Sequence, residues 1–157
     1  MADLATLLRT HNGAGRVAWI GLRLARLEDL QPVQTAQITT SGLRGDHARA
    51  GKRALTLIQA EHLAVISSLA GGVAVTPALL RRNIVVSGIN LTALRHNRLR
   101  LGTAEIKITV PCAPCSRMEK ILGTGGYNAM RGHGGWCAEI VEEGELALSD
   151  QLVPIFD

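Results

Sequence analysis

The regular alternation of residues 104–110 constrains the fold of this chain more than any other feature of the sequence. Apolar residues occupy every second position, and charged or polar residues stand between them. This period of two is typical of a β-strand that buries one face. Further segments that predict strands are 16–24 (Ala18, Ile20, Leu22 and Leu24 on one face), 84–86, 98–101, and the pair 136–142 and 145–148, a hairpin around Glu143-Gly144. With 17 glycines available for turns, the sequence predicts a mainly β fold, a barrel or a sandwich.

A few short helices are expected among these strands. Residues 59–70 have apolar side chains at helical spacing. Thr76 is suited to cap a short helix whose first turn begins with Pro77. Ser116 is expected to cap another helix, with Glu119 at its third position, as in a capping box.

Length and composition fit one domain that spans residues 1–157. No apolar run approaches the roughly 18 residues of a membrane-spanning helix, and residues 1–15 lack the pattern of a secretory signal. Three cysteines are an odd number, which argues against a disulfide framework. We therefore expect a cytoplasmic protein that does not contact a membrane.

The net charge of +4 is compatible with ordinary solubility and also with an anionic partner. One Tyr and one Phe cannot build the aromatic platform on which single-stranded nucleic acids stack. The basic residues are also scattered along the chain rather than gathered in one segment. A small anionic ligand is therefore expected, and nucleic acid is not.

The segment 110–118 carries the strongest chemical signal. A predicted strand ends there, two prolines stiffen the turn, and a helix is expected to begin just after Cys115. A thiol at a helix N-terminus is close to the positive end of the helix dipole, which favours the reactive thiolate, and Arg117 adds positive charge. Cys112 lacks these neighbours. We expect Cys115 to be the reactive, partly exposed thiol and Cys112 to be more buried or secondary.

Other interpretations of the cysteines stay open at this point. They could be small buried side chains. A Cys-x-x-Cys pair also occurs in thioredoxin-like proteins, although the βαβ pattern expected there is absent. Cys112, Cys115, His133 and Cys137 have a spacing that could close a zinc site, which would make the chain a zinc-stabilised binding domain without enzymatic activity.

Two other segments are suited to bind an anion. Arg81, Arg82 and Asn83 stand at the junction of a short helix and a strand, where their side chains could hold a phosphate or a carboxylate. Arg131 and Gly132 belong to a glycine-rich loop whose N–H groups could surround an anion. This loop lacks the Lys-Ser/Thr ending of a Walker motif, so ATP and GTP are not the expected ligands.

The order of these segments resembles that of the MOSC family, named after the C-terminal domain of molybdenum cofactor sulfurase, and suggests a small stand-alone member of bacterial type. The resemblance covers roughly residues 16–156, and Ser149-Asp150 departs from the usual Gly-Asp turn near its end. The segments that carry it are Gly42-Leu43-Arg44-Gly45-Asp46-His47, Arg53, Leu57-Ile58 with Glu61, Leu80-Arg81-Arg82-Asn83-Ile84-Val85-Val86-Ser87-Gly88-Ile89-Asn90-Leu91, Leu101-Gly102, Pro114-Cys115 with Met118-Glu119, and Arg131-Gly132.

The resemblance implies a closed or nearly closed β-barrel with a few short peripheral helices. The characteristic cysteine of the family corresponds to Cys115, which in relatives carries sulfur as a persulfide or coordinates the molybdenum of a pterin cofactor. The residues then expected to bind the molybdenum cofactor (molybdopterin) are Arg53, Arg81, Arg82 and Asn83 at its phosphate end, with Arg131 and Gly132. No PLP-binding domain is expected in this chain.

Two activities follow from the resemblance and stay open. One is the carriage or transfer of sulfur, and the other is the reduction of N-hydroxylated compounds. The second requires an electron-donating partner, because the sequence shows no flavin, haem or iron–sulfur motif. The expected partners are thus the small anionic cofactor and a sulfur-donor or redox protein.

Overall fold

The computed structural model describes residues 1–156, and Asp157, the last residue of the expected domain, lies outside the described residues. The strands are β1 (Gly15–Arg23), β2 (Leu30–Val33), β3 (Thr35–Thr39), β4 (Gly42–Leu43), β5 (Leu55–Gln59), β6 (Ile84–Ser87), β7 (Arg98–Leu101), β8 (Ala104–Pro111), β9 (Trp136–Glu142), β10 (Gly144–Ala147) and β11 (Gln151–Ile155). The helices are α1 (Leu4–Arg9), α2 (Ala60–Leu69), α3 (Pro77–Leu80), α4 (Ser116–Leu122) and α5 (Gly126–Met130), with a 3-10 turn η1 (Leu91–Leu94).

Seven of these strands form a closed barrel. They follow the order β11-β7-β8-β9-β5-β6-β1, and β1 pairs with β11 to complete the circle, with Gly15 opposite Leu152. The strands β5 and β6 run parallel, with α2 and α3 between them in the chain, and the other barrel pairs are antiparallel. The predicted β-barrel with a few short helices is therefore confirmed.

Strand β1 has different neighbours along its length. It pairs with β11 at its start and with β2 at its end, while β6 lies along its other edge. A bulge between Val17 and Trp19 shifts the alternation, so Val17 and Ile20 are both buried in the core. The face predicted for 16–24 is therefore wrong at Ala18 and Leu24, which are exposed. A bulge adds one residue, which a pattern of period two does not anticipate.

A second sheet, in the order β10-β3-β4, contributes side chains to the barrel core. The hairpin predicted from 136–142 and 145–148 is wrong, because β9 pairs with β8 and β5 whereas β10 pairs with β3. The chain changes sheets at Gly144. A Cβ built there would lie 2.5 Å from the main-chain nitrogen of Ala104, so the glycine permits a close approach of two chain segments.

The apolar side chains form two clusters, one on each face of the barrel wall. The inner cluster includes Ala104, Ile106 and Ile108, whose exposed fraction is 0%, as the alternation of 104–110 predicts. The outer cluster lies between the wall and the helices. Its buried members are Ile58 of β5, Val85 of β6, Ile66 of α2, Leu80 of α3, Met118 and Leu122 of α4, and Met130 of α5. This packing fixes the helices to β5 and β6.

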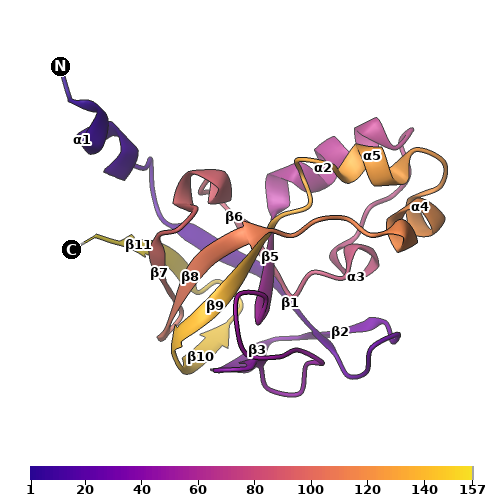
Figure 1. Ribbon diagram of the computed structural model, residues 1–157, viewed down its shortest axis with the longest axis horizontal. Coiled ribbons are helices and arrows are strands. Elements are labelled where there is room, and N and C mark those ends of the chain that lie inside the picture. The colour runs from indigo at the N-terminus through magenta and orange to yellow at the C-terminus, as the bar shows by residue number, and fades with distance from the viewer. Residues whose placement is uncertain (157) are drawn as a thin grey trace.

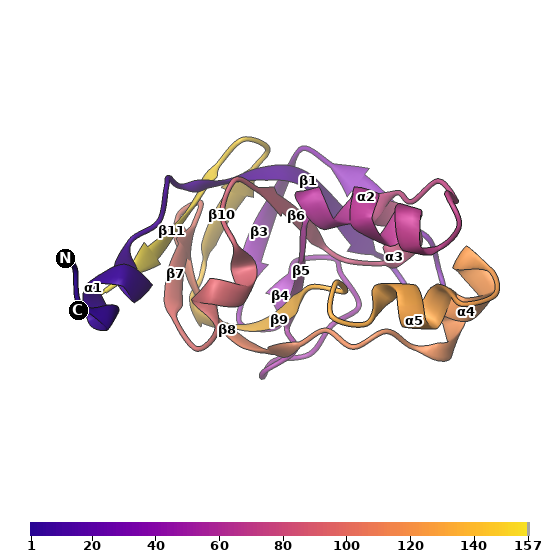
Figure 2. The same ribbon diagram turned by 90° about the horizontal axis from the view of Figure 1, so that it is seen from above.

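The helices are distributed unevenly around the barrel. Helices α2 to α5 gather at one end of the molecule, and α1 lies at the opposite end with both termini (Figure 1). The view from above shows the same separation, with the chain that leaves β8 running out to α4 (Figure 2). Within residues 1–156, none of the helices has the length and apolar character needed to cross a membrane.

Candidate functional site

The chain that leaves β8 carries the two thiols of the Cys-x-x-Cys segment. Cys112 is half-buried and Cys115 is exposed, as predicted. Cys115 is the N-cap of α4, and its carbonyl oxygen accepts a hydrogen bond from the amide of Met118 at 2.9 Å. The predicted cap at Ser116 is therefore wrong by one residue, because Ser116 already belongs to the helix.

Glu119 connects α4 to α5 instead of closing a capping box. Its carboxylate accepts hydrogen bonds from the amides of Gly125 at 2.9 Å and Tyr127 at 3.0 Å. These bonds, first that of Tyr127 and then that of Gly125, lower the pKa of Glu119. The carboxylate thus binds the free N–H groups at the start of the next helix, which holds the two helices beside the cysteine segment.

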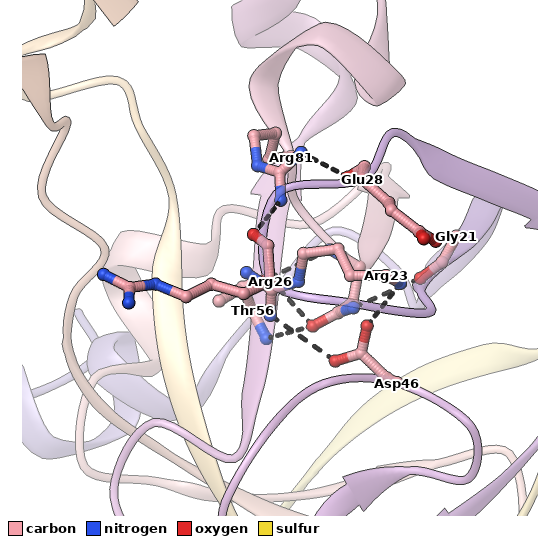
Figure 3. A network of polar contacts seen from close by, with 8 residues as sticks. Gly21, Arg23, Arg26, Glu28, Asp46, Thr56 and Arg81 are labelled. Carbon is pink, nitrogen blue, oxygen red and sulfur yellow. Dashed lines mark hydrogen bonds and ion pairs between the residues drawn. The ribbon is translucent and has the colours of Figure 1, made fainter. Parts of the chain in front are cut away.

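Arg81 holds the turn between β1 and β2 (Figure 3). Its guanidinium donates to the carbonyl oxygens of Glu28 at 2.6 Å and Arg26 at 2.9 Å. Burial, followed by the charges of Arg117 and Arg23, lowers the pKa of Arg81, and Asp29 and Cys115 oppose this shift. The charges of Arg81 and Cys115 therefore act on each other, and the sharing of one cleft by these two residues stays a prediction.

A cleft of about 570 Å³ has Arg81 in its lining, and Cys115 is not among the residues that line it. Two arginines, Arg81 and Arg117, and one acidic residue, Asp29, line it. Its other lining residues are mostly apolar and include Leu27, Leu79 and Ile121. A cleft with cations on an apolar wall is suited to a ligand that joins an anionic group to a flat or apolar body.

Arg82 is buried, with an exposed fraction of 6%. Its guanidinium donates to three main-chain carbonyl oxygens, those of Gly134 at 2.7 Å, Leu80 at 2.8 Å and Cys112 at 3.2 Å. Arg82 thus connects the end of α3 to the cysteine segment and to the glycine-rich loop. This geometry gives it a positioning role and leaves direct contact with a ligand unsupported.

Asn83 is fully buried, and its side chain forms hydrogen bonds inside the wall of the barrel. Its Oδ1 accepts hydrogen bonds from the hydroxyl of Thr56 at 3.0 Å and the amide of Thr56 at 3.3 Å, and its Nδ2 donates to Gly21 at 3.1 Å. Asn83 therefore joins β1, β5 and β6. These internal bonds engage both ends of the amide, so the predicted contact of Asn83 with a phosphate has no support in the geometry.

Arg23 is a cation whose charge acts on Arg81, and the sequence analysis did not single it out. It ends β1, and the fully buried carboxylate of Asp46 accepts hydrogen bonds from its amide at 2.6 Å and from its guanidinium at 3.4 Å (Figure 3). The charge of Arg23 acts on both Arg81 and Cys112. In the sequence, the Gly45-Asp46 turn is the signal that could have led to Arg23. A buried carboxylate requires a cation or several hydrogen-bond donors beside it.

Cys112 and Cys137 are two thiols whose ionisation is linked. Donation by Cys137 lowers the pKa of Cys112 to about 6, with further help from Arg82, Arg23 and Arg53, although burial opposes the shift. The same bond and burial raise the pKa of Cys137. Because Arg82 is fixed beside Cys112, we assign the negative charge to Cys112 and the remaining proton to Cys137.

The structure does not support the alternative of a zinc site at Cys112, Cys115, His133 and Cys137. Within residues 1–156, no three side chains of His, Cys, Asp or Glu come together in a way that could hold a metal ion. His133 instead packs edge-on against His62, with ring centroids 5.5 Å apart. The spacing of the four residues along the chain therefore does not bring them together in the structure.

The remaining predicted site residues lie in two places. Arg53 is exposed, and its charge acts on Cys112 and Cys137. Arg131 and Gly132 line a separate cleft of about 340 Å³ together with Cys112 and Trp136. The structure therefore divides the predicted ligand set between the surroundings of Cys115 and a second cleft beside the glycine-rich loop.

The chain folds as a small β-barrel with an exposed thiol at the start of α4 and a cleft lined by two arginines. A family model described as MOSC domain matches residues 35–153. The chain therefore belongs to the MOSC domain family, which is linked to the molybdenum cofactor. Comparison with curated proteins found no match.

Several solved structures share the fold at low sequence identity. The YuaD protein from Bacillus subtilis is 15% identical, with a TM-score of 0.78, and the match covers 92% of this chain and 98% of that one. YiiM from Escherichia coli is 21% identical, with a TM-score of 0.72, covering 90% of this chain and 70% of that one. YiiM from Geobacillus stearothermophilus is 17% identical, with a TM-score of 0.75, covering 90% and 75%.

Proposed function

We propose that this chain binds the molybdenum cofactor in the cleft beside Cys115, and that the Cys115 thiol is the ligand of molybdenum or the carrier of sulfur. One observation carries the proposal: the exposed Cys115 stands at the start of α4, and Arg117 of the same helix lines a cleft with Arg81. A thiolate is a soft donor that suits such chemistry. Guanidinium groups bind phosphate through paired hydrogen bonds.

Arg23 supports the fit of an anionic or carbonyl-bearing group. Its Nε is buried and has no hydrogen-bond partner in the described part of the chain, although Asp46 binds its amide and its terminal nitrogen. A buried donor without a partner is costly. An acceptor oxygen on the cofactor would satisfy this donor, which is why we include Arg23 among the binding residues.

When bound, the cofactor would supply a metal centre capable of redox chemistry and of holding sulfur. The residues of this chain bind and orient it. Arg81, Arg117 and Arg23 attract the anionic end, and the apolar wall of the cleft accepts the flat body. Cys115 stands at the start of α4, where Glu119 and the packing of Met118 fix the helix.

Arg82 and Asn83 act as positioning residues in this proposal. Arg82 fixes the carbonyl of Cys112 and the loop at Gly134, and Asn83 fixes the wall from which Arg23 projects. Arg53 adds positive charge. Arg131 and Gly132 line the other cleft and stay outside the proposed binding set.

The test is an analysis of molybdenum and pterin in protein purified from a host that makes the cofactor. We expect both in the wild-type protein. Cys115→Ser should lose molybdenum or persulfide loading while it folds normally, and Cys112→Ser should keep most of the pterin. The double variant Arg81→Gln/Arg117→Gln should lose pterin, whereas Arg100→Gln, an exposed arginine on β7, serves as the matched control.

Wild-type loading of pterin and molybdenum in Cys115→Ser and in the double arginine variant would overturn the proposal. The same preparations separate the two activities. Persulfide on Cys115 after incubation with a sulfur donor supports sulfur transfer. Reduction of an N-hydroxylated compound with an artificial electron donor supports the reductase.

A further inference from the structure

A further cleft, of about 530 Å³, is lined by residues of the small sheet β10-β3-β4 and of the turns beside it. This sheet cleft shares no lining residue with the cleft of Arg81 and Arg117 or with that of Arg131. Arg44 and Asp150 both line it. They belong to the segment 42–47 and to the Ser149-Asp150 turn, to which the proposed function gives no role.

Three polar residues of the sheet cleft form one row across the sheet. Glu145 of β10 lies opposite Gln37 of β3. Arg44 directly follows β4, and its amide donates to the carbonyl oxygen of Gln37 at 2.8 Å, so Arg44 continues the pairing of β3 with β4. Residues opposite each other on neighbouring strands have their side chains on one face. Since strands are about 4.8 Å apart, the main chains of Arg44 and Glu145 lie about 10 Å apart, on either side of Gln37.

The two ends of this row carry opposite charges that the protein does not neutralise. Arg44 and Glu145 are exposed. Within residues 1–156, neither the guanidinium of Arg44 nor the carboxylate of Glu145 has an ion-pair or hydrogen-bond partner. The two groups line the same cleft without binding each other. A ligand that carries both charges is suited to bridge them, with the amide of Gln37 between.

Asp150 adds a second carboxylate to the sheet cleft. Its Oδ2 accepts a hydrogen bond from the amide of Ala147 at 2.8 Å, which fixes the side chain. The charged side chains of the cleft are thus one guanidinium and two carboxylates, in a chain whose net charge is +4. Leu22, Ala36 and Leu146 supply apolar lining. The complement of this lining is a ligand with one anionic group, two cationic groups and an apolar stem.

From this arrangement we infer that the sheet cleft binds a basic α-amino acid such as lysine. The carboxylate of the amino acid binds the guanidinium of Arg44. Its two ammonium groups bind the carboxylates of Glu145 and Asp150. The methylene chain lies on the apolar lining, as the stems of lysine side chains do on protein surfaces. This binding is independent of the proposed cofactor and of Cys115.

The test is isothermal titration calorimetry of the full-length protein with lysine in the millimolar range, at low ionic strength. We expect saturable binding at a single site. Alanine lacks the side-chain ammonium group and cadaverine lacks the carboxylate, so each should bind at least about tenfold more weakly. Arg44→Gln and Glu145→Gln should weaken the binding of lysine by a similar factor. The matched controls Arg49→Gln and Glu142→Gln, at exposed residues outside the cleft, should bind lysine like the wild-type protein.

Absence of saturable lysine binding to the wild-type protein would overturn the inference. So would equal affinity for alanine or cadaverine, or wild-type affinity for lysine in either Arg44→Gln or Glu145→Gln. Both substituted side chains are exposed and unpaired within residues 1–156, so the variants should fold, which thermal unfolding checks. The titration requires no cofactor, so its outcome is separate from the loading of pterin and molybdenum.

Discussion

The carboxylate of Asp46 holds the end of β1 by binding Arg23 twice, through its amide at 2.6 Å and its guanidinium at 3.4 Å. The Asp46 side chain is fully buried, while that of Arg23 remains 23% exposed. A buried carboxylate with these two bonds fixes both the backbone and the direction of the arginine. Asp46 thus controls where the positive charge of Arg23 lies, without contact with a ligand.

Asp46→Ala should destabilise the protein by about 1–3 kcal/mol, because it leaves the buried amide of Arg23 without an acceptor. Asp46→Asn should cost less, since its amide oxygen can still accept that bond. Glu142→Gln, at an exposed acidic residue of β9, should change stability by no more than about 0.5 kcal/mol. Urea unfolding of the three variants measures this order, and equal stability of all three would contradict the role of Asp46.

Asn83→Ala should destabilise the protein by about 2–4 kcal/mol, because it removes the partners of Thr56 and Gly21 inside the barrel wall. Thr56→Ser keeps the hydroxyl and should cost much less. Denaturant unfolding gives the stabilities. If Asn83→Ala were stable but failed to load pterin, Asn83 would be a binding residue after all.

Two substitutions of Arg81 distinguish the strain of its backbone from the function of its side chain. Its φ of 60° lies in the left-handed region, which costs glycine nothing. Both Arg81→Ala and Arg81→Gly lose the bonds to Glu28 and Arg26 and should load little pterin. Arg81→Gly should nevertheless be more stable than Arg81→Ala by about 1 kcal/mol. Thermal unfolding and pterin content of the two variants check both statements, and an alanine variant as stable as the glycine variant would contradict the strain.

The thiol pair predicts how stability changes with pH. The pKa of Cys112 is about 6 in the folded protein and about 8.5 when unfolded, so between these values the unfolded state holds more protons and stability rises with pH. Above about 8.5 both unfolded thiols ionise, whereas folded Cys137 keeps its proton, so stability falls.

Urea unfolding at a series of pH values measures this curve. The control is Cys112→Ser, which removes the thiolate and should remove the rise between pH 6 and about 8.5. A rise of the same size in the variant would assign the effect to other groups. The ultraviolet absorbance of the thiolate should follow the same ionisation in the wild-type protein alone.

The sequence predicts the strands in which apolar and polar residues alternate regularly. It does not predict which strands pair with one another. Residues 104–110 show a period of two, and β8 buries the expected face. The partner of β10 was not predictable, because β3 is distant in the chain and its residues have no matching pattern. Pairing between remote strands depends on the packing of the whole core, which local periodicity does not describe.

The sequence predicted the exposed thiol of the candidate site, but only some of the arginines around it. Cys115 is exposed, as its position between the prolines and the predicted helix indicates. In the sequence, Arg82 and Asn83 directly precede an apolar strand. Polar residues at such a position can face solvent or be covered by other parts of the chain. The β1–β2 hairpin covers this position, so Asn83 bonds inside the protein.

The pairing of β1 with β11 imposes an order on the assembly of the protein during translation. β1 is the first of the barrel strands to leave the ribosome and β11 is the last, so the barrel cannot close until synthesis has passed Ile155. Until then β1 and β7 carry edges that other chains can bind. The final contact spans nearly the whole described chain, and such remote contacts form slowly. The nascent chain should therefore depend on protection by chaperones until its last strand arrives.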